Sequence, residues 1–385
     1  MYNIQTLNKI SAVGTDIFDK SKYNVSDAPE NPDAIMVRSA KMHDMQFNEN
    51  LLAIARAGAG VNNIPVERCA EEGICVFNTP GANSNAVKEL AICALLLASR
   101  KITEAAAWAA SLKGTPDAPK TVEGGKSKFA GPEIMGKTLG IIGLGAIGAL
   151  VANAAIALGM KVVGTDPFLS VNAALRLSPS VKVVPTADAV YAECDYLTVH
   201  VPCNADTKGF INAETIAKMK DGVRVLNFAR GELVNDADMI SALESGKVAC
   251  YITDFPNQNT LGVKNIVAVP HLGASTPESE DNCAVMASRE LIDYIENGNI
   301  TNSVNLPNAE MNATGKKICI IHKNVPSIIS QITTALANAN TNIENMVNKS
   351  KKDYAYTMID AGDSYNESTV SAIEAIEGVI KVRVI

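Results

Sequence analysis

Short apolar runs alternate with polar, turn-rich segments along the first part of the chain. The runs at 33–40, 51–60 and 73–82 read DAIMVRSA, LLAIARAGAG and GICVFNTPGA, and helix-compatible segments separate them. Strands at this spacing indicate βα units and a parallel sheet. Residues 85–100 (NAVKELAICALLLASR) then predict a long helix that begins near Asn85.

The alternation becomes more regular from Thr138 onward. Each of the next apolar runs is followed by polar or turn residues: TLGIIGLG, KVVGTDP, VKVVP, YLTVHVP, RVLNFAR, ACYITDF and NIVAVPH. Runs this uniformly apolar are typical of strands buried on both faces, so we expect a doubly wound parallel sheet. The stretch 111–137 before it is rich in Gly, Pro and Lys and is interpreted as a surface connection.

The periodicity stops at NLPNAEMNATGKK, and a different pattern begins after it. The remaining residues predict strands and helices in the order βαββαβ, a small ferredoxin-like module. The fold class is therefore α/β with three parts. We expect a first domain at 1–88 completed by 277–302, a doubly wound domain at 89–276, a linker at 303–316 and the module at 317–385.

Composition and charge exclude several classes of protein. The 385 residues are 47% apolar and 19% charged, which is ordinary for a globular chain. A net charge of −7 argues against nucleic-acid or membrane partners. The N-terminus lacks a signal-peptide layout, and the eight cysteines form no C-x-x-C pair. A cytoplasmic location fits these features, and we expect no metal site.

The strongest motif is a glycine turn at the start of the regular region. Gly143, Gly145 and Gly148 form G-x-G-x-x-G between an apolar strand and a helical pattern. Such a turn lets a pyrophosphate approach the backbone at a helix N-terminus. Asp166 ends the next strand, 18 residues beyond Gly148, where a carboxylate accepts from a ribose diol and repels a 2′-phosphate. The motif therefore predicts NAD rather than NADP.

Two polar residues follow later strands of the same sheet. Arg230 comes after RVLNFA and His271 after NIVAVP, so both belong at the carboxyl edge, where such sheets bind ligands. A guanidinium there can bind a carboxylate with two hydrogen bonds, and an imidazole suits proton transfer near neutral pH. The alternatives are an arginine on a surface loop and a structural histidine.

Several stretches together resemble the D-isomer-specific 2-hydroxyacid dehydrogenases. The resemblance covers essentially the whole chain and is greatest for members that oxidise D-3-phosphoglycerate to 3-phosphohydroxypyruvate with NAD, the first step of phosphorylated serine synthesis. The matching stretches are VRSA (37–40), RAGAGVNNI (56–64), NTPGANSNAVKEL (78–90), NFARGELVNDADMISALESGKVACYITDF (227–255) and VPHLGAST (269–276).

The resemblance implies a flavodoxin-like, split substrate domain and a Rossmann NAD-binding domain. It also implies that His271 takes the hydroxyl proton while Arg230 holds the substrate carboxylate. The implied cofactor contacts are Gly143, Gly145, Ala146, Ile147, Gly148, Asp166, Val201, Phe228, Ala229, Arg230, Asp254, His271, Gly273 and Ala274.

The substrate phosphate and carboxylate have further implied partners early in the chain. Arg38 and Ser39 match the residues that contact the phosphate, and Arg56 is a second candidate. The backbone of Ala57, Gly58 and Ala59 matches the loop that cradles the carboxylate. By composition alone, Arg38 could instead end a surface strand and the glycines could form an ordinary turn.

One family residue is missing. Members carry a glutamate 29 positions after the arginine that fixes the histidine ring, but here that position is Asn259, or Gln258 if one residue is deleted. An amide can orient a ring without the charge that stabilises an imidazolium. Asp254 and Glu278 are substitute carboxylates.

The C-terminal module resembles an ACT domain, an amino-acid-binding fold. The resemblance implies L-serine as an effector at His322, Asn324 and Asn342, although Ser327 replaces a usual glycine. The alternative is a module used only for pairing. We expect a homodimer or homotetramer. Two other functions stay open: a dehydrogenase for glycerate or hydroxypyruvate, and a non-catalytic NAD-sensing protein.

Overall fold

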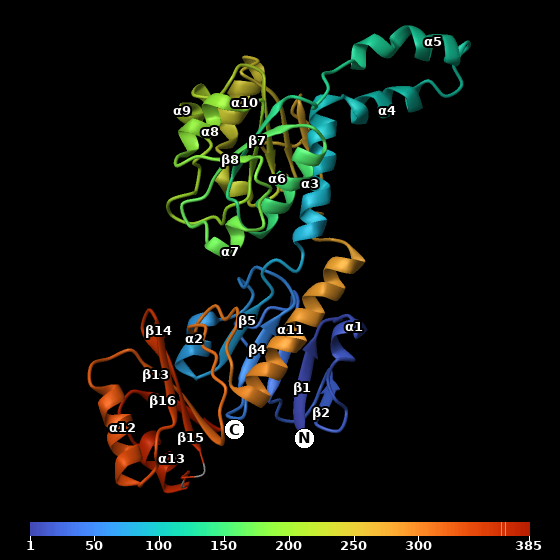
Figure 1. Cartoon of the computed structure of the whole chain (residues 1–385). Helices are drawn as coiled ribbons and strands as arrows, with labels where there is room; N and C mark the ends of the chain where they lie inside the picture. The colour runs from blue at the N-terminus through green and yellow to red at the C-terminus, as the bar shows by residue number, and fades with distance from the viewer. Residues whose placement is uncertain (363, 366) are drawn as a thin grey trace. The chain divides into compact units, whose positions relative to one another are not determined.

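The computed structural model describes residues 1–362, 364–365 and 367–385 (Figure 1). The chain divides into two compact units, one formed by Met1–Asn83 with Pro277–Ile385 and the other by Ser84–Thr276. The first unit contains the expected first domain and the C-terminal module, and the second contains the glycine turn. Among the described residues, no helix combines the length and apolar character needed to cross a bilayer.

The first unit begins with a parallel sheet of five strands in the order β2-β1-β3-β4-β5, the flavodoxin-like order that was predicted. Its strands and helices are β1 (Tyr2–Leu7), α1 (Ala12–Thr15), β2 (Tyr23–Ser26), β3 (Ala34–Val37), β4 (Ala53–Arg56), α2 (Val66–Glu71), β5 (Cys75–Asn78) and α11 (Pro277–Asn297). Every residue of β3 is buried because the strand is apolar on both faces. The long helix α11 returns from late in the sequence and packs against α1 and the strands β3, β4 and β5.

The second unit holds a parallel sheet of seven strands in the order β12-β11-β10-β9-β6-β7-β8. Numbered within the unit, this is the doubly wound Rossmann order, which confirms the predicted fold class. The strands are β6 (Thr138–Ile142), β7 (Lys161–Thr165), β8 (Val181–Val183), β9 (Tyr196–Val199), β10 (Val223–Asn227), β11 (Val248–Thr253) and β12 (Ile266–Ala268). The helices are α3 (Ser84–Ser99), α6 (Ala146–Ala157), α7 (Val171–Ala174), α8 (Ala187–Glu193), α9 (Ala213–Ala217), α10 (Asp236–Glu244) and the 3-10 turn η2 (Gly231–Leu233).

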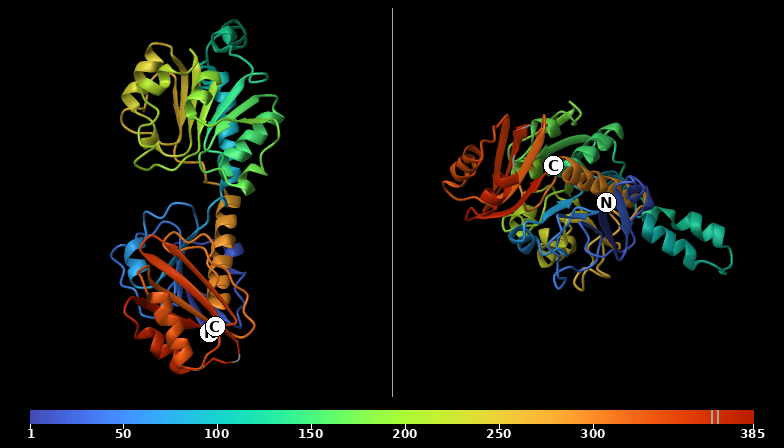
Figure 2. Two further views of the ribbon diagram at one scale, coloured as in Figure 1. Left: turned by 60° about the vertical axis from the view of Figure 1, so that its left-hand side comes forward. Right: turned by 90° about the horizontal axis from the view of Figure 1, so that it is seen from below.

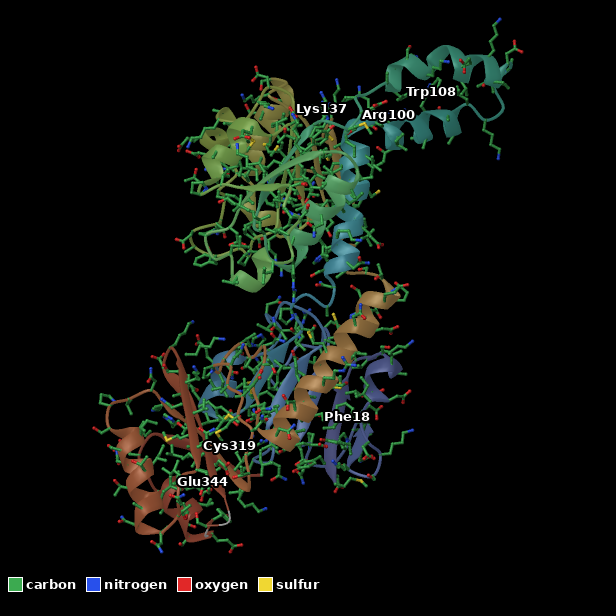
Figure 3. All side chains as sticks on the ribbon, viewed as in Figure 1. Phe18, Arg100, Trp108, Lys137, Cys319 and Glu344 are labelled. Atoms are coloured by element: carbon green, nitrogen blue, oxygen red, sulfur yellow. The ribbon has the colours of Figure 1, made fainter. Side chains whose placement is uncertain are left out.

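The predicted surface connection is largely helical. It contains the end of α4 (Ile102–Ser111), then α5 (Ala118–Gly125) and η1 (Lys126–Phe129), which form a hairpin that extends away from the strands of its own unit (Figures 1 and 2). Figure 3 labels Trp108 on this hairpin, and its ring packs against Phe129 at 5.2 Å between centroids. The alanine-rich run of α4 has high helix propensity but lies almost wholly before the predicted stretch. Within that stretch, the proline of α5 lies in the first turn, where a helix tolerates it.

The C-terminal module has the predicted βαββαβ order. Its elements are β13 (Lys316–Lys323), α12 (Ile328–Asn338), β14 (Asn345–Lys351), β15 (Tyr354–Gly362), α13 (Glu367–Glu374) and β16 (Val379–Val384). The sheet order is β14-β15-β13-β16, and all three pairings are antiparallel. Both helices cover one face, where Ile318 and Ile320 of β13 are buried (Figure 2).

The other face of that sheet belongs to the core of the first unit. Cys319 and Ile321 alternate with the helix-facing residues of β13 and pack in one cluster with Phe77 and Tyr294. The stretch expected to be a linker, 303–316, contributes its own buried side chains to the same cluster, namely Leu306, Ala309 and Met311. The module is therefore attached through a continuous apolar core.

Candidate active site

The three glycines of the turn between β6 and α6 differ in what a side chain at each position would contact. Gly143 has φ 93°, and a Cβ on it would lie 2.6 Å from the carbonyl oxygen of His200 and 2.9 Å from the side chain of Val201. A Cβ on Gly148 would collide with the carbonyl of Gly143, so that glycine permits close packing of helix on strand. A Cβ on Gly145 would meet nothing within 4 Å, which leaves open space in front of the turn.

The N-terminus of α6 faces that space with unused donors. Gly145 is the N-cap and supplies no side-chain cap, so the first N–H groups of the helix, on Ala146, Ile147 and Gly148, lack one. Asp166, after β7, accepts from the backbone N–H of Leu144 at 2.9 Å and from that of Phe168 at 2.9 Å. Its carboxylate is thus fixed beside the turn and keeps lone pairs for a diol.

The ends of β10, β11 and β12 come together at the carboxyl edge of the sheet. Asn227, fully buried, donates to the carbonyl of Arg230 at 2.8 Å and accepts from Ala229 N–H at 3.1 Å. These bonds shape the loop that carries Phe228, which is buried, and Arg230, which is exposed. The Arg230 guanidinium donates to the carbonyl of Ala229 at 2.6 Å and keeps its other N–H groups for a ligand.

His271 follows β12 and is exposed. Its ring packs against Phe255, with centroids 4.6 Å apart and planes at 48°. No side-chain hydrogen bond reaches the ring from the described residues. The aromatic contact holds one face of the imidazole, while the ring nitrogens stay available to a ligand.

Asp254 is the carboxylate beside this histidine in the second unit. It is fully buried, and its Oδ2 accepts from Gly273 N–H at 2.9 Å. Its Oδ1 has no hydrogen-bond partner within the described part of the chain. Burial raises the pKa of Asp254, while the Gly273 N–H and the charge of nearby His271 oppose that rise. Ala274 follows Gly273 in this loop and is half-buried.

Two arginines meet at the carboxyl edge of the other sheet, in the first unit. Arg56 ends β4, opposite Val37 in β3, and its Nε donates to the carbonyl of Arg38 at 3.1 Å. Gly58 has φ 148°, and a Cβ there would overlap the Arg56 guanidinium. The Ser39 N–H donates to Asn8 Oδ1 at 3.1 Å, which positions the segment after β3.

The loop after β4 is held by main-chain contacts. Ala57 N–H donates to the carbonyl of Val37 at 2.8 Å, and Ala59 accepts from the Asn78 side chain at 2.6 Å. The expected residues Arg38, Ser39 and Arg56 to Ala59 therefore lie at one edge of one sheet.

Residues 92–273 match the family described as D-isomer specific 2-hydroxyacid dehydrogenase, NAD binding domain. The matched residues make up most of the second unit. It is 38% identical over 291 residues to a D-3-phosphoglycerate dehydrogenase of Archaeoglobus fulgidus, covering 72% of this chain and 52% of that protein. It is 34% identical over 325 residues to that of Bacillus subtilis, covering 80% and 59%. The chain thus spans about half the length of these curated relatives.

Solved structures agree on the fold. A 3-phosphoglycerate dehydrogenase of Entamoeba histolytica with bound NAD+ superposes with a TM-score of 0.61 at 26% identity, covering 80% of this chain and 99% of that chain. A D-mandelate dehydrogenase of Rhodotorula graminis gives a TM-score of 0.67 at 22% identity, covering 79% and 97%.

The matched family domain binds NAD, and the residues of this chain fit that cofactor. The open space at Gly145 and the uncapped start of α6 suit a pyrophosphate, and Asp166 is fixed where a ribose diol would meet it. The orphaned Oδ1 of buried Asp254 is an acceptor that a cofactor amide would satisfy. Among the described residues, no cluster of His, Cys, Asp and Glu is arranged to hold a metal.

The side-chain amides at the position of the family's glutamate form their hydrogen bonds away from the His271 ring. Gln258 and Asn259 are both exposed, and the Asn259 amide donates to Asp236 Oδ2 at 3.3 Å. Asn257 donates to the same oxygen at 2.8 Å. Glu278, the other candidate carboxylate, lies in the first turn of α11 in the first unit.

The three expected effector residues have internal partners. His322 is 1% exposed, with Nδ1 2.8 Å from the carbonyl of Lys323 and Nε2 2.8 Å from Thr357 Oγ1. Burial lowers its pKa. Asn324 donates to the carbonyl of Lys352 at 3.1 Å, and Asn342 to Glu344 at 2.8 Å.

The serine at the usual glycine position has φ 66°. A backbone in that left-handed region favours glycine, which gives a physical reason for the residue that relatives use there.

Some residues that shape these edges escaped the sequence analysis. Asn227 and Phe255 were hidden inside matching stretches, where only Arg230 and Asp254 stood out. Glu280 was not singled out, but it forms an ion pair with Arg38 at 2.8 Å. Nothing local signals that pair, because the two residues are far apart in the sequence.

Proposed function

We propose that this protein is an enzyme that oxidises D-3-phosphoglycerate to 3-phosphohydroxypyruvate with NAD, the first step of phosphorylated L-serine synthesis. The observation that carries the proposal is the pair of arginines at one sheet edge, since Arg56 donates to the carbonyl of Arg38. Two guanidinium groups suit a dianionic phosphate. The relatives named above are called D-3-phosphoglycerate dehydrogenases, which supports the same substrate.

The roles of the residues follow from their chemistry. Arg38, Arg56 and Ser39 bind the phosphate, and Arg230 binds the carboxylate and so orients the C2 hydrogen. His271 takes the proton of the C2 hydroxyl as the C2–H bond breaks. NAD, held at the glycine turn, would supply the acceptor for the hydride of that bond, so that the ketone is left. With no carboxylate on its ring, His271 is oriented by Phe255 and stays near the charge of Asp254.

We also propose that the chain assembles as a homodimer or homotetramer in the cytoplasm. The hairpin of α4 and α5 supports association, because no residue of α4 is buried and Ile102 and Val122 are 51% and 40% exposed. Exposed apolar side chains gathered on one element mark interaction surfaces. L-serine at the ACT-like module, near His322, Asn324 and Asn342, is the proposed effector.

The test is NADH formation from D-3-phosphoglycerate beside D-glycerate and 2-hydroxyglutarate, with and without L-serine. We expect turnover selective for the phosphorylated substrate. Arg38→Ala should raise its KM about 100-fold, because charged hydrogen bonds are lost, and leave D-glycerate within about two-fold. Arg289→Ala, at an exposed position of α11 in the same unit, removes an equal charge and should change neither KM.

Turnover of D-glycerate alone would identify the other dehydrogenase instead. Tight NADH binding without turnover of any of these acids would favour the non-catalytic NAD-sensing protein. The absent glutamate is the reason for considering that alternative.

A further inference from the structure

The arginine assigned to the phosphate already has an anionic partner. Arg38 Nη2 lies 2.8 Å from Glu280 Oε1, and the two side chains are 42% and 44% exposed. Glu280 sits in the first turn of α11, within the same unit as β3. The pair is therefore open to solvent at the edge where the phosphate is expected.

A second observation places these charges together. Cys283 lies three residues after Glu280 on α11, and burial raises the pKa of its thiol. The polar side chain of Thr79 and the charges of Arg56 and Arg38 oppose that rise in pKa, while the charge of Glu280 adds to it. Arg56, Arg38 and Glu280 thus all lie near enough to this thiol to influence its charge, and Arg38 and Glu280 contact each other directly.

We propose that Glu280 is a specificity-determining residue that competes with the substrate phosphate for Arg38 and so sets the affinity for phosphorylated substrates. The inference rests on the proposed function, because it presumes that the phosphate binds at Arg38. A phosphate dianion that reaches Arg38 must displace the carboxylate or lie beside it, and either costs binding free energy through lost pairing or like-charge repulsion.

The effect has a defined size and selectivity. Because both side chains are nearly half-exposed, solvent screens the repulsion, and we expect removal of the carboxylate charge to strengthen phosphate binding about 3- to 10-fold. A substrate without a phosphate does not use Arg38, so its affinity should stay the same. The residue therefore changes the preference between the two substrates.

The experiment compares Glu280→Gln with Glu278→Gln in the full-length protein. Glu278 shares the first turn of α11, is also exposed, and forms no salt bridge with any described residue, so its variant reports the general loss of a charge there. The readout is the ratio of kcat/KM for D-3-phosphoglycerate to kcat/KM for D-glycerate. An effect on His271 would change both values equally and leave this ratio unchanged.

We expect Glu280→Gln to lower the KM for D-3-phosphoglycerate 3- to 10-fold with kcat nearly unchanged, and Glu278→Gln to change the ratio by less than two-fold. In an Arg38→Ala background, Glu280→Gln should have no effect, since the competing site is gone. An unchanged KM would overturn the proposal. A raised KM would overturn it too and would make Glu280 a residue that orients Arg38.

A readout that needs no turnover separates this inference from the proposed function. Inorganic phosphate should protect the Glu280→Gln protein against thermal unfolding at several-fold lower concentration than the wild type. If phosphate protects the variant more strongly but the wild type does not turn over D-3-phosphoglycerate, the competition at Arg38 stands and the proposed substrate is rejected. If the wild type turns over D-3-phosphoglycerate but phosphate protects both proteins equally, the proposed substrate stands and the competition is rejected.

Discussion

The two sheet edges of this protein offer different kinds of groups to their expected ligands. In the second unit, the glycine turn offers backbone N–H groups and open space, and two backbone bonds fix Asp166. In the first unit, charged side chains form the edge, and Arg38 already pairs with Glu280. A site formed by the main chain has one arrangement. A site formed by long charged side chains can exchange partners, so its affinity depends on the residues around it.

The largest expected effect tests the main-chain site. Gly148→Ala places a methyl group against the carbonyl of Gly143, so helix and strand must separate. We expect a loss of about 2–4 kcal/mol in the free energy of unfolding of the second unit, in the range of overpacked cores. Chemical denaturation followed by circular dichroism measures it.

Gly145→Ala is the matched control, because its methyl group meets no atom within 4 Å. It should unfold like the wild type and yet bind NADH at least ten-fold more weakly, since the methyl group occupies the space left for the pyrophosphate. Equal stability of both variants would mean that the turn adapts, and the contrast between the two edges would fail.

The second prediction concerns charge in the first unit. Glu290 on α11 is 7% exposed, accepts from Asn302 at 2.7 Å and has no partner for Oε2 among the described residues. Burial raises its pKa from 4.5 to about 8. A carboxyl group whose pKa is higher in the folded than in the unfolded protein stabilises the fold at pH values below the unfolded-state pKa. For Glu290, this contribution is lost as the pH rises from 4.5 to about 8.

Glu290→Gln removes this titration and keeps an acceptor for Asn302. We expect the variant to be more stable than the wild type by roughly 1–3 kcal/mol at pH 9, with the difference shrinking toward pH 5. Thermal unfolding across that range measures it. A difference that stays constant with pH would show that Glu290 does not titrate in this range.

The same contrast explains what the sequence could predict. The doubly wound parallel sheet and the position of Asp166 follow from local patterns: uniform apolar runs, a glycine spacing and the strand end after it. The flavodoxin-like order of the first sheet agrees with what the family resemblance implied. Helix α5 was missed because its Gly and Pro residues were interpreted as turn signals, although its proline lies in the first turn, where a helix tolerates it.

The attachment of the C-terminal module and the Arg38–Glu280 pair depend on contacts between distant segments. Alternation along β13 shows that two faces are buried, but it does not name the partner of either face. Side-chain pairs of this kind become visible only once the chain has folded.

The smallest expected effect concerns the position where relatives carry a glutamate. Asn259 is exposed, and its amide donates to Asp236 Oδ2 at 3.3 Å. The amide of Asn257 donates to the same oxygen at 2.8 Å. Because neither contact involves the His271 ring, Asn259→Ala should leave kcat/KM for D-3-phosphoglycerate within about two-fold at every pH from 6 to 10, as a weak exposed hydrogen bond suggests. Phe255→Leu, which removes the aromatic contact to His271, is the comparison and should lower kcat several-fold. A ten-fold loss in Asn259→Ala, or a displaced acidic limb, would mean that the amide supports the histidine during turnover and that this edge also rearranges its side-chain partners.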